Sequence, residues 1–261
     1  MEMKFVKINK QMLLPFMMYN SPIRYSENIV LHPILMKDII IFQSLESSIT
    51  LRKNSTFREK KIIKMTYLDF LLFSAGNMEL EIQYNILGLS NYYYHAIKLL
   101  QLCCKDSDIR IEKDTGKLTI NGEIVTSEIF DDLRRIIIIQ NDIDFDIDEF
   151  INYDTEQRLL KAQKDLSRDD DSVSIEDYID SLVIVMHVTE EYVMNMTIRK
   201  FWRYIKRYNL HETYTIAKTG ECSGFVKFNE PIKHWMRSID DDEDKYKNLK
   251  TDESELRSKV I

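Results

Sequence analysis

Residues 174–235 carry the strongest helical pattern of the chain, and their sequence is SIEDYIDSLVIVMHVTEEYVMNMTIRKFWRYIKRYNLHETYTIAKTGECSGFVKFNEPIKHW. Ser174 is a favourable residue for a helix N-cap, and Asp177 follows at the spacing of a capping box. The apolar residues that come next repeat at helical spacing and are Ile175, Tyr178, Ile179, Leu182, Val183 and Met186. One apolar stripe at this period predicts an amphipathic helix that buries one face.

A second helix is predicted to begin at Thr189, where Glu190 and Glu191 suit the positive end of a helix dipole. Its apolar stripe consists of Met194, Ile198, Phe201, Trp202, Ile205 and Tyr208. Helices with such stripes bury them on each other or on a partner, so these six residues are our candidate partner-binding residues. The opposite side is basic and contains Arg199, Lys200, Arg203, Lys206 and Arg207.

The end of this stretch contains signals for a helix stop and a strand. We expect the helix to stop at Gly220, because glycine adopts the left-handed conformation of a C-terminal cap at little cost. Residues 223–228 alternate with period two, which predicts a short strand near 223–229, ended by Pro231. His234 and Trp235 then supply a last apolar anchor.

Composition limits the class of protein. A chain of 261 residues has room for one large or two modest domains, and its six glycines and four prolines are few for a turn-dense β fold. The net charge of −7 argues against a general nucleic-acid binder, and three cysteines do not make a disulfide framework. No apolar run is long enough to cross a membrane, and the first residues lack the pattern of a signal peptide. We therefore expect a protein of the cytoplasm that associates with neither membranes nor nucleic acid.

The fold class predicted for the whole chain is mainly α, with helical bundle domains, a small β-hairpin at about 108–124 and the short strand near 223–229. The hairpin is indicated by apolar and charged residues that alternate around turns at Thr115–Gly116 and Asn121–Gly122. Further helices are expected at 34–45, 66–76, 77–87, 91–102 and 126–140. Residues 1–28 are expected to form a short strand or extended arm, and residues 46–56 a polar loop.

The domain organisation follows from the charged segment at 167–173, which we interpret as a linker. The expected parts are a mixed, mostly helical N-terminal domain at 1–166, that linker, a helical C-terminal domain at 174–237 and a disordered acidic tail at 238–261. The tail serves either as a solubility device or as a tether.

Residues that could carry chemistry form no recognisable constellation. Asp142, Asp144, Asp146 and Asp148 alternate as in a calcium loop, but Ile147 and Tyr153 occupy the positions where an EF-hand needs glycine and glutamate. The five histidines are far apart, and adjacent cysteines at 103 and 104 favour burial over redox chemistry. We expect no catalytic residue, no metal and no cofactor. An enzyme whose site is assembled from distant residues, including Glu190 and Glu191, is the weaker hypothesis.

The basic side of the second helix has two interpretations that fit the acidic chain better than nucleic-acid binding. It is a solvated face, or it faces an acidic segment of a partner.

Three stretches resemble a group of phage proteins from low-GC firmicute hosts. They are residues 30–40 (VLHPILMKDII), residues 117–136 (KLTINGEIVTSEIFDDLRRI) and residues 196–201 (MTIRKF) with 224–228 (GFVKF) and 234–235 (HW). The group is similar to the mid-sized proteins of phage tail morphogenesis, in which tail assembly chaperones are the best-defined members.

The resemblance implies a non-enzymatic protein of the host cytoplasm that binds a phage tail protein, either the tape measure protein or the tube protein. A tail assembly chaperone keeps the helical tape measure protein soluble until the tail tube polymerises around it. The chain is larger than the usual short chaperone, so a structural component of the tail or baseplate, retained in the virion, is the alternative. Formation of a homo-oligomer is possible under either interpretation.

Overall fold

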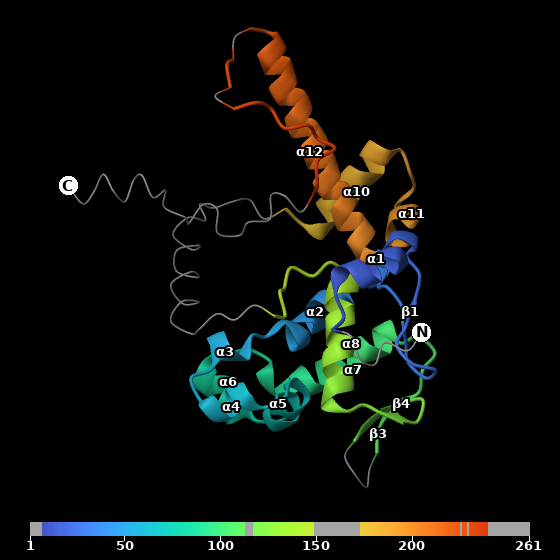
Figure 1. Cartoon of the computed structure of the whole chain (residues 1–261), viewed down its shortest axis with the longest axis vertical. Helices are drawn as coiled ribbons and strands as arrows, with labels where there is room; N and C mark the ends of the chain where they lie inside the picture. The colour runs from blue at the N-terminus through green and yellow to red at the C-terminus, as the bar shows by residue number, and fades with distance from the viewer. Residues whose placement is uncertain (1–6, 113–116, 149–172, 225, 229, 240–261) are drawn as a thin grey trace, which may run out of the picture. The chain divides into compact units, whose positions relative to one another are not determined.

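The computed structural model describes residues 7–112, 117–148, 173–224, 226–228 and 230–239. The fold is mainly α with two small antiparallel sheets, as the sequence predicted (Figure 1). The chain divides into two compact units. Unit 1 contains residues 1–160 and 191–199, and unit 2 contains residues 161–190 and 200–261. The tail was expected at 238–261, and its residues 240–261 lie outside the described residues, as does all of the expected linker except Val173.

Unit 1 contains most of the elements. Its helices are α1 (Lys10–Tyr19), η1 (Met36–Asp38), α2 (Ile39–Thr50), α3 (Lys53–Thr56), α4 (Lys60–Lys64), α5 (Tyr67–Ser74), α6 (Met78–Tyr84), η2 (Leu89–Asn91), α7 (Tyr92–Cys103) and α8 (Ser127–Gln140). Its core forms where α2 packs on α7 and where α5 and α1 pack on α8. Phe57 and Phe70 are fully buried, with ring centroids 5.3 Å apart.

The two sheets of unit 1 are short. β1 (Ile23–Arg24) pairs antiparallel with β2 (Val30–Leu31), and β4 (Leu118–Ile120) lies between β3 (Ile109–Ile111) and β5 (Glu123–Ile124). The expected hairpin strands are thus confirmed. Its second turn is confirmed as well, because Asn121 and Gly122 have φ angles of 50° and 81°, which the tight hairpin turns of type I′ require. Thr115 and Gly116 lie outside the described residues.

Two helix starts were predicted correctly where a threonine side chain caps them. The side chains of Thr66 and Thr126 accept hydrogen bonds from the backbone N–H groups of Asp69 and Ile129, at the starts of α5 and α8. Such a cap satisfies one of the backbone donors that a helix leaves without a partner at its N-terminus.

Two predictions for the first 60 residues are corrected. A short strand or extended arm was expected at 1–28, and a short strand is present as β1, but residues 10–19 form helix α1, which Asn9 caps and which contains Pro15. Burial of Leu13 and Met17 offsets the hydrogen bond that the proline removes. The loop expected at 46–56 instead contains the end of α2 and the short helix α3, because Ser48 and Ile49 are buried.

Arg134 is a charged residue inside the core of unit 1, only 7% exposed. Its Nε donates to the carbonyl oxygen of Ile49 over 2.6 Å, and its guanidinium lies 3.6 Å from the centre of the Tyr67 ring. Burial lowers the pKa of Arg134 and raises the pKa of Tyr67 to about 12. The Tyr67 phenol is therefore neutral at neutral pH, and its ring faces the Arg134 guanidinium in a cation–π contact.

We expect Arg134→Ala to lower the free energy of unfolding by about 3 kcal/mol, because it removes a charged hydrogen bond and a buried cation–π contact. The matched control is Arg110→Ala, since Arg110 pairs with Asp108 over 2.6 Å while both side chains are largely exposed. That control should change the stability by less than about 1 kcal/mol. Urea unfolding of both variants measures the difference, and equal losses would contradict a structural role for Arg134.

Candidate functional site

Unit 2 is built on α10 (Ile175–Met186) and on α12 (Ile198–Cys222), whose first two residues belong to unit 1. The predicted capping box is present at the start of α10. The backbone N–H of Asp177 donates to Ser174 Oγ over 3.1 Å, and the backbone N–H of Ser174 donates to the Asp177 carboxylate over 2.9 Å. These hydrogen bonds hold the pKa of Asp177 below its usual value. The start of α10 is thereby fixed.

The second predicted helix is interrupted. A short helix α11 (Glu190–Met194) ends before α12 begins at Ile198. Residues 196–198 form an isolated β-bridge in unit 1, in which Leu35 pairs with Thr197. The backbone N–H of Met36 donates to the carbonyl oxygen of Met196 over 2.8 Å, and the backbone N–H of Ile198 donates to the carbonyl oxygen of Ile34 over 2.9 Å. A long-range backbone pairing therefore replaces the helical hydrogen bonds that the sequence pattern suggested.

The six candidate partner-binding residues fall into two groups of three. Ile198, Phe201 and Ile205 are buried, with exposed fractions of 2%, 0% and 7%. Met194, Trp202 and Tyr208 are partly exposed. Within unit 2, the Trp202 ring packs against Tyr178 of α10, with centroids 5.3 Å apart. In the folded chain, a partner could therefore reach the second group and not the first.

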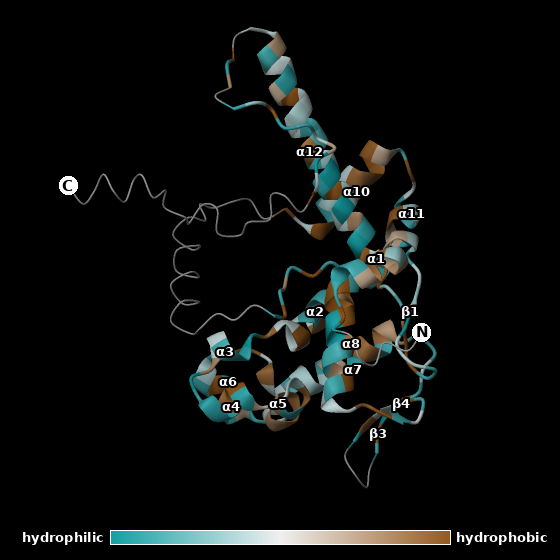
Figure 2. Ribbon diagram, viewed as in Figure 1, coloured by the Kyte–Doolittle hydropathy of each residue, from teal (hydrophilic) through white to brown (hydrophobic). Residues whose placement is uncertain are grey.

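Other apolar side chains of unit 2 are more exposed than any of these six. Ile184 on α10 and Ile216 on α12 are each 70% exposed, and Met236 is 66% exposed. The two helices differ in hydropathy in Figure 2, where α10 has several apolar residues and α12 is largely hydrophilic. Ile184 lies outside the predicted apolar stripe of α10, and none of the three is among the candidate partner-binding residues.

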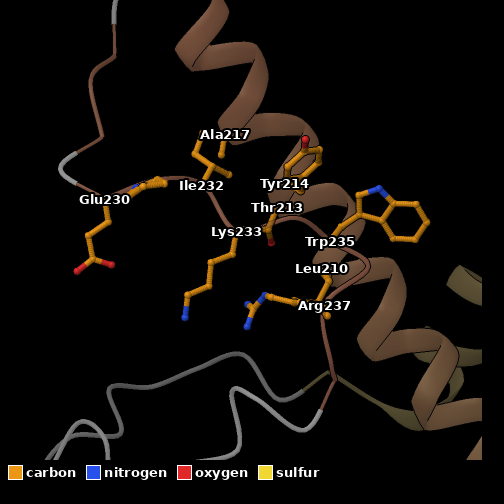
Figure 3. Close-up of a pocket in the computed structure, with 10 residues that line it drawn as sticks. Leu210, Thr213, Tyr214, Ala217, Glu230, Ile232, Lys233, Trp235 and Arg237 are labelled. Carbon is orange, nitrogen blue, oxygen red and sulfur yellow. The ribbon is translucent and has the colours of Figure 1, made fainter.

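The last described residues of the chain pack against the side of α12 that is opposite its apolar stripe. Residues 230–237 return along the helix, where His234 and Trp235 lie against Tyr214 and His211, with ring centroids 5.0 Å apart in both pairs (Figure 3). Arg207 Nη1 donates to the carbonyl oxygens of Trp235 and Arg237, over 2.5 and 2.9 Å. The prediction that His234–Trp235 form an apolar anchor is thus confirmed, and the anchor is on α12.

The returning segment and α12 enclose a hollow of about 290 Å³. Its walls combine apolar side chains, such as Leu210 and Ile232, with the charged residues Glu230, Lys233 and Arg237 (Figure 3). This mixture is suited to a polypeptide side chain rather than to a tightly enclosed small molecule.

The strand and helix end expected near this hollow are corrected by the structure. The described residues between 223 and 228 contain no strand, because no neighbouring strand pairs with them there. The helix does not stop at Gly220 but continues to Cys222, and Gly224, with a φ of 75°, takes the left-handed turn. Val226 packs 3.7 Å from the position that a Gly220 side chain would occupy, so a glycine suits that place through its small size.

Asp148, Cys103 and Cys104, which were considered as chemical sites, form ion pairs or are buried in the structure. Asp148 accepts two hydrogen bonds from Arg135, at 2.7 and 2.8 Å, and pairs with Lys7 at 3.1 Å, which lowers its pKa to about 2. Cys103 and Cys104 are buried, as expected, and burial raises the pKa of both thiols. Across the described ranges, no three residues among His, Cys, Asp and Glu are grouped so that they could hold a metal ion.

A family model matches the C-terminal part of the chain. Residues 161–240 match the family model of the YomV second domain. This part of the chain is similar to a YomV second domain. The match covers less than half of the chain, and it is consistent with a phage-related protein while saying nothing about tail assembly. No curated protein and no solved structure matches the chain. None of the helices in the described residues combines the length and apolar character needed to span a bilayer.

We expect Arg207→Met to release the returning segment, because it removes both side-chain hydrogen bonds to that backbone while keeping much of the aliphatic length. Backbone N–H groups of residues 232–237 should exchange with deuterium about tenfold faster, as the loss of a charged hydrogen bond implies. The matched control is Lys218→Met at the other end of α12, where Lys218 pairs with the exposed Glu221. Unchanged exchange in the Arg207 variant would show that the rings alone hold the segment.

Proposed function

We propose that the chain is a non-enzymatic phage protein that binds a helical protein partner through unit 2. The observation that carries this proposal is the exposure of apolar side chains on two helices, with Ile184 and Ile216 each 70% exposed. Large apolar side chains left in water on a helix are typical anchors for another helix or groove. The partly exposed Trp202 and Tyr208 add aromatic side chains, which contribute strongly at protein interfaces.

The specific form that we propose is a tail assembly chaperone acting in the host cytoplasm, with the tape measure protein as partner. Two observations support it: the resemblance of the three sequence stretches and the net charge of −7. The match of residues 161–240 to the YomV second domain supports only the phage origin of the chain. A charged chain helps to keep a complex with an apolar helical partner in solution. The alternative is that the chain is a structural component of the phage tail or baseplate. Mass spectrometry of purified virions separates the two, because a chaperone leaves the particle and a component stays.

The proposal predicts that co-expression with the tape measure protein of the same genome yields a soluble complex. Ile184→Asp and Ile216→Asp, tested one at a time, should each reduce the recovered complex about tenfold, because a charge is placed in an apolar contact. The matched control is Ile40→Asp on α2 of unit 1, where the side chain is 64% exposed. Circular dichroism should be unchanged in all three variants. Full recovery with both unit 2 variants, or equal loss with the control, would contradict binding through unit 2.

A further inference from the structure

The hollow between α12 and the returning segment has walls that are fixed relative to each other. The Tyr214 ring lies against His234, and the His211 ring lies against Trp235, with ring centroids 5.0 Å apart in each pair. Arg207 adds two hydrogen bonds to the backbone of the segment. A site whose walls are in place before binding loses little conformational freedom when it is filled. The hollow is therefore preformed.

The inside of the hollow is mainly apolar. Leu210 and Ala217 line it from α12, and Ile232 lines it from the segment, where it lies beside Ala217 (Figure 3). The volume of about 290 Å³ is just below the range of about 300–1,000 Å³ that is usual for small-molecule sites. The space and its apolar floor are thus suited to one aliphatic side chain.

The charged residues of the hollow give its rim a positive balance. Lys233 and Arg237 line it together with a single acid, Glu230, and the two cationic side chains extend toward the same side (Figure 3). Arg207 is close to this rim as well, because it donates to the Arg237 carbonyl oxygen over 2.9 Å. On a chain of net charge −7, such a rim favours an incoming carboxylate.

The hollow is next to an exposed apolar side chain of the proposed partner surface. Thr213, which lines the hollow, precedes Ile216 by three positions on α12. Residues three apart on a helix are neighbours on its surface. Ile216 is 70% exposed, so a partner that covers it also reaches the rim of the hollow.

We propose that the hollow receives an aliphatic side chain of the protein partner and that an acidic residue beside this anchor pairs with Lys233. The inference rests on the proposed function, since it states the chemistry of the segment that unit 2 binds. An exposed ion pair contributes little to affinity, so the anchor supplies most of the binding. The charge of the rim selects an acidic segment over a basic one.

The experiment titrates the full chain with three capped tripeptides and observes its backbone N–H signals by NMR. A tripeptide of glutamate, leucine and glutamate should shift the signals of residues 210–217 and 231–237 in a saturable way. The expected dissociation constant is on the order of millimolar, as one partly buried side chain and one ion pair imply. Replacing leucine by serine should weaken binding about tenfold, and replacing both glutamates by lysine about fivefold.

One pair of variants tests the anchor site. Ala217→Phe places a ring in the hollow and should abolish the shifts. The matched control is Thr215→Phe, because position 215 is about 200° round the helix from position 217 and does not line the hollow. Hydrogen exchange at residues 232–237 should be the same in both variants, which shows that the segment stays in place.

A second pair tests the rim and does not alter the apolar floor. Lys233→Glu should weaken the acidic tripeptide about fivefold and strengthen the basic one, since the pairing charge is reversed. The matched control is Lys227→Glu, at an exposed position that does not line the hollow, and it should change neither affinity.

Equal binding of the acidic and basic tripeptides to the unaltered chain would overturn the inference, as would unchanged binding in both the Ala217 and the Lys233 variants. Shifts at the same residues that grow with protein concentration in the absence of peptide would assign the hollow to a second copy and would overturn it too. Failure of the proposed function is distinguishable. In that case, Ile184→Asp and Ile216→Asp leave the co-expressed complex intact while the tripeptide still binds.

Discussion

The backbone bridge between residues 34–36 and 196–198 is the constraint on which the path of the chain depends. It joins segments about 160 positions apart through hydrogen bonds of 2.8 and 2.9 Å. Met36, Met196 and Ile198 are all buried, so their backbone groups need partners inside the protein. The bridge explains why residues 191–199 belong to unit 1 although residues on both sides of them belong to unit 2. It also sets the point at which α12 begins.

α12 is 25 residues long, about 37 Å, and its two sides have different roles. One side carries the apolar stripe from Ile198 to Tyr208, in which the aliphatic residues and Phe201 are internal. The other side is covered over much of its length by a segment without secondary structure. Its ring contacts and the two hydrogen bonds from Arg207 hold this segment in place. A single amphipathic helix thereby organises both the core of unit 2 and the surface offered to other groups.

Local signals predicted the parts of this fold that local chemistry determines. The cap of Thr66, the capping box of Ser174 and the turn at Asn121–Gly122 depend on residues within four positions, so the sequence was sufficient. The break at 195–197 and the missing strand near 223–229 depend on partners far along the chain or on the lack of one. The sequence also could not predict which residues of the stripe are buried, because a docking face and a core face have the same periodicity. The sequence therefore predicted the stripe but could not separate its buried members from its accessible ones.

The bonds from Arg207 end on main-chain oxygens, and this determines which substitutions the returning segment can accept. A carbonyl group is present whatever the side chain, so the anchor imposes no requirement on the residue types at 235 and 237. Met236, 66% exposed between them, is constrained even less. Related sequences can therefore vary at position 237 and keep these bonds, whereas position 235 also supplies the ring that packs against His211, and a change at Arg207 removes both bonds. A motif search based on the segment would miss such relatives, and one based on the spacing of Arg207, Leu210 and Tyr214 would find them.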